Sequence, residues 1–184
     1  MAAPHDLDAL HAAVWQELAR AVTDRDHAWR LGVLATVDDG RPDARTVVLR
    51  EVEPAARLLR LYTDARSAKV RQLLLQPRGC LVLWSPGLSW QVRLDLELAV
   101  DRDGLAVSSR WARLALTSSA RDYLSPLAPG ADLEPTATPA PPLDRRNHFA
   151  VLHGRVLGID WLEIGVPHRR AAWSRDGAGR WLQP

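Results

Sequence analysis

The 184-residue sequence predicts a mainly β protein, with six or more short, mostly antiparallel strands and a few inserted helices. The clearest strand signal is the alternation of apolar and polar residues in 88–100, whose apolar face consists of Val92, Leu94, Leu96, Leu98 and Val100. Asp39-Gly40 lies between two apolar runs and is a tight-turn signal, which predicts a hairpin. Strands and helices do not alternate along the chain, so the pattern favours a barrel or a strongly curved sheet over a doubly wound parallel sheet.

An amphipathic helix is expected within residues 1–24, because apolar residues recur there at helical spacing from Leu7 to Ala21. Apolar runs predict strands at residues 29–37, 44–53, 57–63, 79–85, 88–100 and 147–165, followed by short closing strands. Further helices are expected at residues 67–76, 108–116 and 120–124. Residues 125–146 are rich in proline, which lacks an N–H group, and are expected to form an exposed loop. The sequence has no internal repeat, so we expect one domain over residues 1–184.

The charge balance argues against nucleic acid or an anionic membrane as the main partner. Lysine and arginine number 24 against 22 acidic residues, which gives a formal net charge of only +2. No stretch approaches the roughly 18 apolar residues of a membrane span. The N-terminus lacks the basic region of a signal peptide, so we expect a cytoplasmic protein. Cys80 is the only cysteine, which excludes an intramolecular disulfide.

Several common site motifs are missing from the sequence. It contains neither G-x-G-x-x-G nor G-x-x-x-x-G-K-[ST], so a Rossmann or P-loop nucleotide site has no support. The six histidines show no H-x-H or H-E-x-x-H spacing, so we expect no metal site. A G-x-S-x-G nucleophile elbow is also absent.

Lys69, the only lysine of the chain, lies at the expected start of the helix at 67–76. A helix start presents unpaired backbone N–H groups and a partial positive charge. Ser67 offers a hydroxyl at this point, and Arg66 and Lys69 offer positive charge. These residue types suit a phosphate group. The alternative is a helix cap flanked by solvated charges, and the segment by itself does not separate the two interpretations.

Four segments together resemble the flavin-binding split-barrel family of pyridoxamine 5'-phosphate oxidase and its relatives. They are "RTVVLR" at 45–50, "YTDARSAK" at 62–69, "WQVR" at 90–93 and a tryptophan followed by "PHRR" at 161–170. The chain looks most similar to the smaller group of pyridoxamine-phosphate-oxidase-related FMN-binding proteins. The resemblance implies a six-stranded antiparallel split β-barrel with peripheral helices. It also implies a homodimer with FMN at the subunit interface.

The resemblance assigns cofactor-binding roles to residues of this sequence. Arg45, Ser67 and Lys69 would bind the FMN phosphate, and Arg66 would replace a guanidinium that the family carries where this chain has Ala68. Other positions would contact the flavin or match family residues beside it: Thr46, Val47, Val48, Tyr62, Thr63 and Gln91. The partner subunit would add Trp161 and Arg170, with Arg169 a near-equal candidate for the second role.

The substrate half of the family pattern is largely lost. Arg50 stands where the oxidase has a lysine that helps to hold the substrate, and the tyrosine–arginine–serine motif for the substrate phosphate is absent. At its spacing, Tyr123 is followed by Leu127 and Ala131. Oxidation of a vitamin B6 phosphate is therefore not expected. Arg50 and His168 are the candidate catalytic residues.

These observations favour an FMN-dependent oxidoreductase that acts on a small molecule which the sequence does not identify. Flavin carries out the redox chemistry itself, which suits a chain without a recognisable catalytic constellation. A non-catalytic flavin-binding module is the main alternative. A third possibility keeps the split barrel but exchanges FMN for a deazaflavin or heme.

Overall fold

The computed structural model describes residues 3–133 and 147–184. Eight strands form the sheet: β1 Leu31–Asp38, β2 Arg41–Glu53, β3 Leu58–Asp64, β4 Arg78–Ser85, β5 Trp90–Asp101, β6 Phe149–Glu163, β7 Arg169–Trp173 and β8 Gly179–Leu182. The helices are α1 Leu7–Thr23, α2 Ala68–Leu75 and α3 Leu105–Leu114, with short 3-10 turns η1 Ala28–Arg30, η2 Pro54–Ala56 and η3 Ser118–Tyr123.

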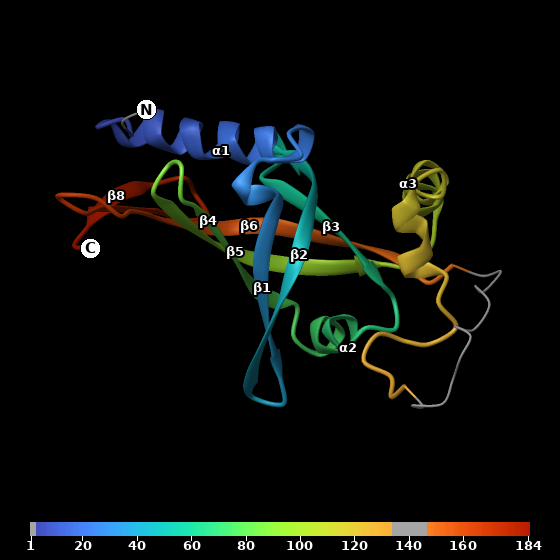
Figure 1. The fold of residues 1–184 in the computed structure, drawn as a ribbon. Coiled ribbons are helices and arrows are strands. Elements are labelled where there is room, and N and C mark those ends of the chain that lie inside the picture. Colours follow the sequence, from blue (N-terminus) through green and yellow to red (C-terminus); the bar gives the residue numbers. More distant parts are fainter. Residues whose placement is uncertain (1–2, 134–146) are drawn as a thin grey trace.

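All of the strand pairs are antiparallel, and the strand order is β3-β2-β1-β4-β5-β6-β7-β8. An additional pairing of β3 with β6 closes a ring of six strands, and β7 and β8 continue the sheet beyond β6. Figure 1 shows this twisted ring with β7 and β8 extending from one end. The predicted mainly β fold with a six-stranded antiparallel split barrel is therefore confirmed, and β7 and β8 add two strands to it.

The hairpin predicted at Asp39-Gly40 joins β1 to β2. Both turn residues have positive φ, at 48° and 76°, which is the backbone of a two-residue turn whose twist matches that of the flanking strands. Asp38 pairs with Arg41 directly beside the turn. This register places Arg45 opposite Leu34 and Thr46 opposite Val33, so the turn fixes which side of β2 faces the barrel interior.

The barrel interior holds the main hydrophobic core. Inward-facing leucines of the ring are almost fully buried, among them Leu34, Leu49, Leu61, Leu81, Leu83, Leu94 and Leu96. Helix α1 lies across β2 and reaches β8 (Figure 1), and it contributes the fully buried side chains Leu10, Val14 and Leu18. Each of these buried leucines contributes roughly 2–3 kcal/mol of hydrophobic transfer free energy.

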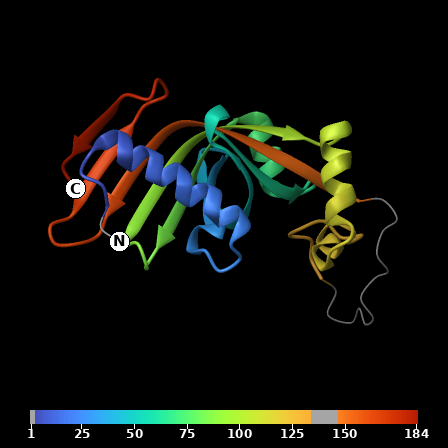
Figure 2. The ribbon, with the colours of Figure 1, turned by 90° about the horizontal axis from the view of Figure 1, so that it is seen from above.

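A second, smaller core lies where α3 and η3 pack on the ends of β3 and β6 at one end of the molecule (Figure 2). Its buried members are Val107, Leu114, Tyr123, Phe149 and Val151. Helix α3 begins three residues before the predicted segment, because Gly104 adopts a φ of 87° and turns the chain into the helix early.

Only part of the predicted proline-rich loop is visible. Residues 126–133 contain no helix or strand, and residues 134–146 of the predicted loop lie outside the described residues. In the described ranges, no helix is both long enough and apolar enough to cross a membrane. The assignment of a single domain to residues 1–184 stays a prediction.

Candidate functional site

Three side chains meet at the start of α2. The Lys69 ammonium group donates hydrogen bonds to the hydroxyl oxygens of Thr63, at 3.0 Å, and Ser67, at 3.2 Å, and these two hydroxyls lie 3.2 Å apart. Ser67 is the N-cap residue of α2, yet its side chain makes no capping hydrogen bond. The hydroxyl is instead turned toward Lys69. The first N–H groups of α2 and the Lys69 ammonium group therefore lie close to the same pair of hydroxyls.

The charge of Lys69 is not neutralised by an adjacent carboxylate. No ion pair joins it to an acid in the described parts of the chain, although Asp64 and Asp43 are near enough to favour its charged form. Burial and then the positive charge of Arg45 lower the pKa of Lys69, and the two aspartates oppose this shift. Two cations thus lie within electrostatic reach of each other beside a pair of buried hydroxyls. An anion bound here would relieve the repulsion.

Arg45 is anchored by a partly buried network of polar side chains. Its terminal nitrogens donate to the Leu34 carbonyl at 3.2 Å, to the Gln72 side-chain oxygen at 3.1 Å, and to Thr36 and Asp43. Gln72 accepts from the Thr36 hydroxyl at 2.6 Å and donates to Asp43 at 2.7 Å. These bonds use both terminal nitrogens of Arg45. In the described residues, the Nε–H group is the donor that remains for a ligand.

Arg66 points to a different set of partners. Its guanidinium forms two hydrogen bonds with the Asp64 carboxylate, at 3.1 and 2.7 Å. It also donates to backbone carbonyls of the loop after η3, those of Ser125, Pro126 and Leu127. Arg66 therefore ties this loop to the start of α2. Its predicted contact with the FMN phosphate stays a prediction.

Thr46, Val48 and Gln91, three of the residues predicted to contact the flavin ring, share one outer face of the sheet. Side chains directly opposite in an antiparallel pair lie on the same face. Leu31 pairs with Val48, and Val33 pairs with both Thr46 and Val82. Trp84 lies two residues beyond Val82 and pairs with Gln91, which continues the same face. Val47 points inward, so its side chain is buried and only its backbone is available.

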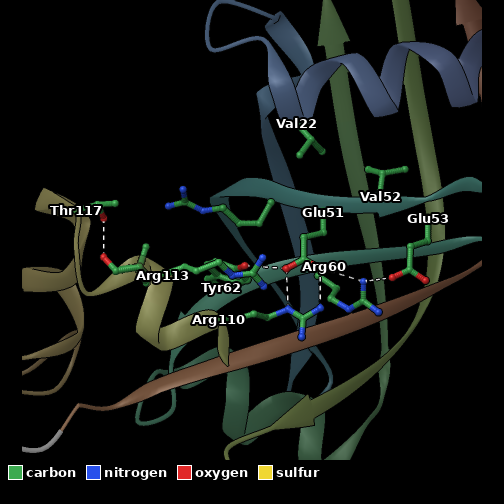
Figure 3. A pocket seen from close by; sticks show the side chains of 11 residues that line it. Val22, Glu51, Val52, Glu53, Arg60, Tyr62, Arg110, Arg113 and Thr117 are labelled. Atoms are coloured by element: carbon green, nitrogen blue, oxygen red, sulfur yellow. Dashed lines mark hydrogen bonds and ion pairs between the residues drawn. The ribbon is translucent and has the colours of Figure 1, made fainter. Parts of the chain in front are cut away.

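A groove opens beyond Arg50, between β2, β3 and α3 (Figure 3). It encloses about 580 Å³ and is lined by Val22, Arg50, Glu51, Val52, Glu53, Arg60, Tyr62, Arg110, Arg113, Leu114 and Thr117. Arg50 and Tyr62, both predicted from the sequence, are thus brought together here. The Arg50 guanidinium lies 5.5 Å from the centre of the Tyr62 ring, a distance suited to a cation–π contact.

Glu51 accepts hydrogen bonds from three polar side chains that line this groove. Arg110 donates to both of its oxygens, at 2.6 and 2.7 Å, and Arg60 and the Tyr62 hydroxyl donate at 3.1 and 2.8 Å (Figure 3). Burial by itself would raise the pKa of Glu51, but these hydrogen bonds and arginine charges lower it to about 2. Burial and the contact with Glu51 raise the pKa of Tyr62 to about 12. Glu51 is therefore ionised and the Tyr62 hydroxyl is protonated at neutral pH.

The C-terminal candidates lie on β6, β7 and the turn between them, at the opposite end of the molecule from α3 (Figure 2). Trp161 is fully buried in its own subunit, 5.5 Å from the ring of Trp90. Arg169 lies over the Trp161 ring at 5.6 Å, and Arg170 forms an ion pair with Asp160 at 2.7 Å. His168 is exposed. These residues do not join Lys69 within one chain, and their predicted role in a second subunit stays a prediction.

The polar residues that hold the site in place are not predicted from the sequence. Gln72 lies on the buried side of α2 between Val70 and Leu73, so a polar residue on an apolar helix face was the available signal. Glu51 and Arg110 gave no local signal, because they are 59 residues apart in the sequence. Among the described residues, no three histidine, cysteine or acidic side chains gather as a metal site would require.

Comparison with known proteins points to one family. Residues 12–100 match the model of the pyridoxamine 5'-phosphate oxidase, FMN-binding domain. Seven curated relatives match, each named as a pyridoxine/pyridoxamine 5'-phosphate oxidase. The one from Microcystis aeruginosa is 36% identical over 81 residues, which are 44% of this chain and 37% of that protein. The match thus spans little more than a third of that relative's length.

Solved structures extend the likeness over nearly the whole fold. A pyridoxamine 5'-phosphate oxidase-related, FMN binding protein from Nostoc punctiforme is 26% identical with a TM-score of 0.71, over 94% of this chain and 96% of that chain. Two more distant structures share the fold alone. An FAD-binding protein from Mesorhizobium loti is 14% identical (TM-score 0.53, 82% and 92% coverage), and a heme binding protein from Mycobacterium smegmatis is 19% identical (TM-score 0.54, 89% and 59% coverage).

Proposed function

Over residues 12–100 the chain belongs to the pyridoxamine 5'-phosphate oxidase-related FMN-binding split-barrel family, and on this premise we propose that it is an FMN-dependent oxidoreductase acting on a small molecule. One observation carries the proposal of FMN. Lys69 is half-buried beside the hydroxyls of Thr63 and Ser67 at the start of a helix, with the charge of Arg45 within reach and no carboxylate paired to it in the described residues.

The donor set at α2 fits the phosphate group of FMN. A phosphate monoester carries close to two negative charges at neutral pH and several strong acceptor oxygens. The Lys69 ammonium group, the Ser67 and Thr63 hydroxyls and the first N–H groups of α2 are the donors that such a group requires. Each cation near the phosphate gives on the order of 4 kcal/mol of attraction before the cost of desolvation. Arg45 would add its Nε–H group and its charge.

The outer face of the sheet provides the surface for the ring. The backbone of residues 46–48 and the side chain of Gln91 would contact the flavin, since they share this face with Leu31 and Val33. When bound, FMN supplies the electron-pair transfer itself. The chain's own residues bind the phosphate, orient the ring and, through Arg50 at the end of the same face, position the molecule that reacts.

A second copy of the chain would complete the site. The outer face exposes Leu31, Val33 and Trp84, which are 55%, 43% and 43% accessible. Large apolar residues grouped on neighbouring strands favour burial in an interface. A homodimer built on this face would cover the flavin. It would also bring the partner's own β6–β7 region, with Trp161 and Arg170, into reach of the ring.

One observation favours the alternative of a flavin-binding module without catalysis. Tyr123, the only residue kept from the substrate-phosphate motif, is buried in the small core with Phe149 and Trp111 rather than exposed to a ligand. The family's site for the substrate phosphate therefore has no counterpart at these positions. The heme and FAD proteins of the same fold also keep a different cofactor open as an alternative.

The visible spectrum of the freshly purified protein tests the proposal. We expect flavin absorbance, FMN as the extracted cofactor by mass spectrometry, and bleaching when a reduced nicotinamide or another electron donor is added without oxygen. Bound FMN that no donor in a broad panel reduces would favour the non-catalytic module. A colourless protein, or one that releases heme or FAD, would contradict the proposal.

A further inference from the structure

The turn between β3 and α2 is held by an ion pair with a buried carboxylate. Asp64, the last residue of β3, is only 6% exposed, and both of its carboxylate oxygens accept hydrogen bonds from the Arg66 guanidinium. The Arg66 backbone N–H also donates to this carboxylate, at 2.7 Å, and the Ser67 N–H donates to the Asp64 carbonyl at 3.1 Å. The ion pair therefore fixes the backbone that presents Ser67 and the first N–H groups of α2.

Arg66 also holds the loop that follows η3. Its Nη1 donates to the Pro126 carbonyl at 3.2 Å, and its Nη2 donates to the carbonyls of Ser125 and Leu127 at 2.8 and 3.2 Å. Three consecutive carbonyl groups of one loop thus converge on one side chain. Figure 1 shows the described part of this loop passing beside α2. We call Asp64, Arg66 and these three loop residues the clasp.

The clasp differs from the neighbouring Lys69 region in its hydrogen-bonding character. Beside Lys69 the polar groups can all donate, since its ammonium group lies next to the hydroxyls of Thr63 and Ser67. The groups around Arg66 are acceptors, a carboxylate and three backbone carbonyls, and its guanidinium already donates to all of them. A second phosphate near the clasp would compete with Asp64 and the loop for Arg66. It would leave a buried carboxylate without its partner, which is unfavourable.

The split-barrel fold does not by itself restrict the flavin to FMN, since the FAD-binding protein from Mesorhizobium loti shares the fold. A preference for one flavin would therefore come from residues of the individual chain. In FMN the phosphate ends the molecule. In FAD the same phosphate continues into a second phosphate and a nucleoside, which need open space and further hydrogen-bond donors beyond the first phosphate.

We propose that the clasp makes the phosphate end of this site specific for a flavin mononucleotide and excludes a flavin dinucleotide. Asp64 and the loop carbonyls close the space beyond the first phosphate. Arg66 holds them there as a positioning residue and does not itself donate to the phosphate. The inference rests on the proposed function for the presence of a flavin, and it adds the residues that select the form of the flavin.

Titration of the full-length, flavin-free protein with FMN, FAD and riboflavin tests the inference by flavin fluorescence. The double variant Asp64→Asn, Arg66→Gln removes the ion pair, keeps the local net charge and leaves an acceptor for the backbone N–H of residue 66. We expect the wild type to bind FMN at least about a hundredfold more tightly than FAD. The double variant should reduce this ratio by about tenfold or more, and should keep the ratio of FMN to riboflavin affinity within about threefold.

Hydrogen–deuterium exchange of the flavin-free protein gives a second readout that does not depend on flavin. The peptide that covers residues 123–133 should exchange faster in the double variant, because the loop loses the side chain that holds it. Arg71→Gln is the matched control, because Arg71 lies on α2 and its 3.2 Å ion pair with Asp38 is on the exposed surface. This control should change neither the affinity ratios nor the exchange.

A double variant with the wild-type ratio of FMN to FAD affinity, or a wild type that binds FMN without discriminating against FAD, overturns the inference and leaves the proposed binding of FMN standing. Unchanged exchange of the loop peptide also overturns it. A fall of about tenfold in the ratio of FMN to riboflavin affinity would make Arg66 a phosphate ligand and contradict its positioning role. A wild type that binds no flavin contradicts the proposed function, and the inference falls with it.

Discussion

The charged form of Lys69 is disfavoured in the protein without bound flavin. Because burial and Arg45 lower its pKa below the ordinary 10.5, the unfolded chain binds more protons than the folded chain over a range of pH below that value. The stability of the flavin-free protein should therefore rise with pH across this range. Lys69 lies at a position where its positive charge is disfavoured, which is typical of a binding residue rather than of a structural one.

Lys69→Met separates the effect of Lys69 on stability from its effect on FMN binding. We expect it to stabilise the flavin-free protein at pH 7 and to flatten the rise of stability with pH, because the disfavoured charge is gone. Its affinity for FMN should fall by about tenfold to a hundredfold with the loss of a charge-assisted contact. Urea unfolding of the flavin-free proteins and fluorescence titration with FMN measure the two quantities. A variant that is less stable and binds FMN normally would show that Lys69 serves the fold alone.

Glu51 should govern stability in acid. Its pKa of about 2 in the folded protein lies below the ordinary 4.5, so its contribution is fully present above pH 4.5 and is lost as the pH falls toward 2. Glu51→Gln should cost about 1–2 kcal/mol at pH 7, because Arg110 and Arg60 lose their partner. Its stability should also change less than that of the wild type between pH 4.5 and 2, as measured by urea unfolding.

Glu97→Gln is the control for this variant, because its 4.0 Å contact with Arg155 lies on the exposed surface. We expect a change below about 1 kcal/mol. Equal effects of the two substitutions would mean that the arginine contacts of Glu51 add nothing beyond a surface charge.

At the scale of elements, α2 begins without the side-chain cap that a serine usually supplies. Ser67 directs its hydroxyl to Lys69 and Thr63 instead, whereas Asp6 caps α1 by accepting from the Ala9 N–H at 2.8 Å. An N-cap side chain typically contributes about 1 kcal/mol. Asp6 therefore caps its helix and Ser67 does not, and the two roles predict different effects of substitution on stability and on FMN binding.

Ser67→Ala and Asp6→Ala form a matched pair. Ser67→Ala loses no capping bond and should lower stability only through its hydrogen bonds with Lys69 and Thr63, while it weakens FMN binding several-fold. Asp6→Ala should cost about 1 kcal/mol and leave FMN affinity unchanged. Denaturant unfolding and FMN titration of both variants provide the comparison. The reverse pattern would assign Ser67 to helix capping and remove it from the binding site.

At the scale of the whole molecule, the apolar outer face of β1 and β4 should join two copies of the chain. Val33→Arg places a charge at the centre of that face and should yield a monomer with weakened FMN binding. Leu105→Arg, at an exposed position on α3, should leave the assembly unchanged. Light scattering coupled to size exclusion measures both. A wild-type monomer that binds FMN would show that one chain is sufficient.

How far the sequence predicts this molecule depends on how local each feature is. The Asp39-Gly40 turn and the alternation in β5 are encoded by neighbouring residues, and both are confirmed. The network around Arg45 depends on Gln72, which is 27 residues away, so no local pattern reports it. The motif that contains Trp161 does not report its burial, which follows from the alternation along β6 that turns this side chain into the core.

The central claim is that the start of α2 binds a phosphate group, and paired titrations with FMN and riboflavin test it most directly. Riboflavin keeps the ring and lacks the phosphate, so the ratio of the two dissociation constants isolates the contribution of the phosphate. We expect the wild type to bind FMN at least about a hundredfold more tightly than riboflavin, and Lys69→Met to reduce this ratio by about tenfold or more. Equal affinity of the wild type for both flavins, or the same ratio in both proteins, would contradict the claim.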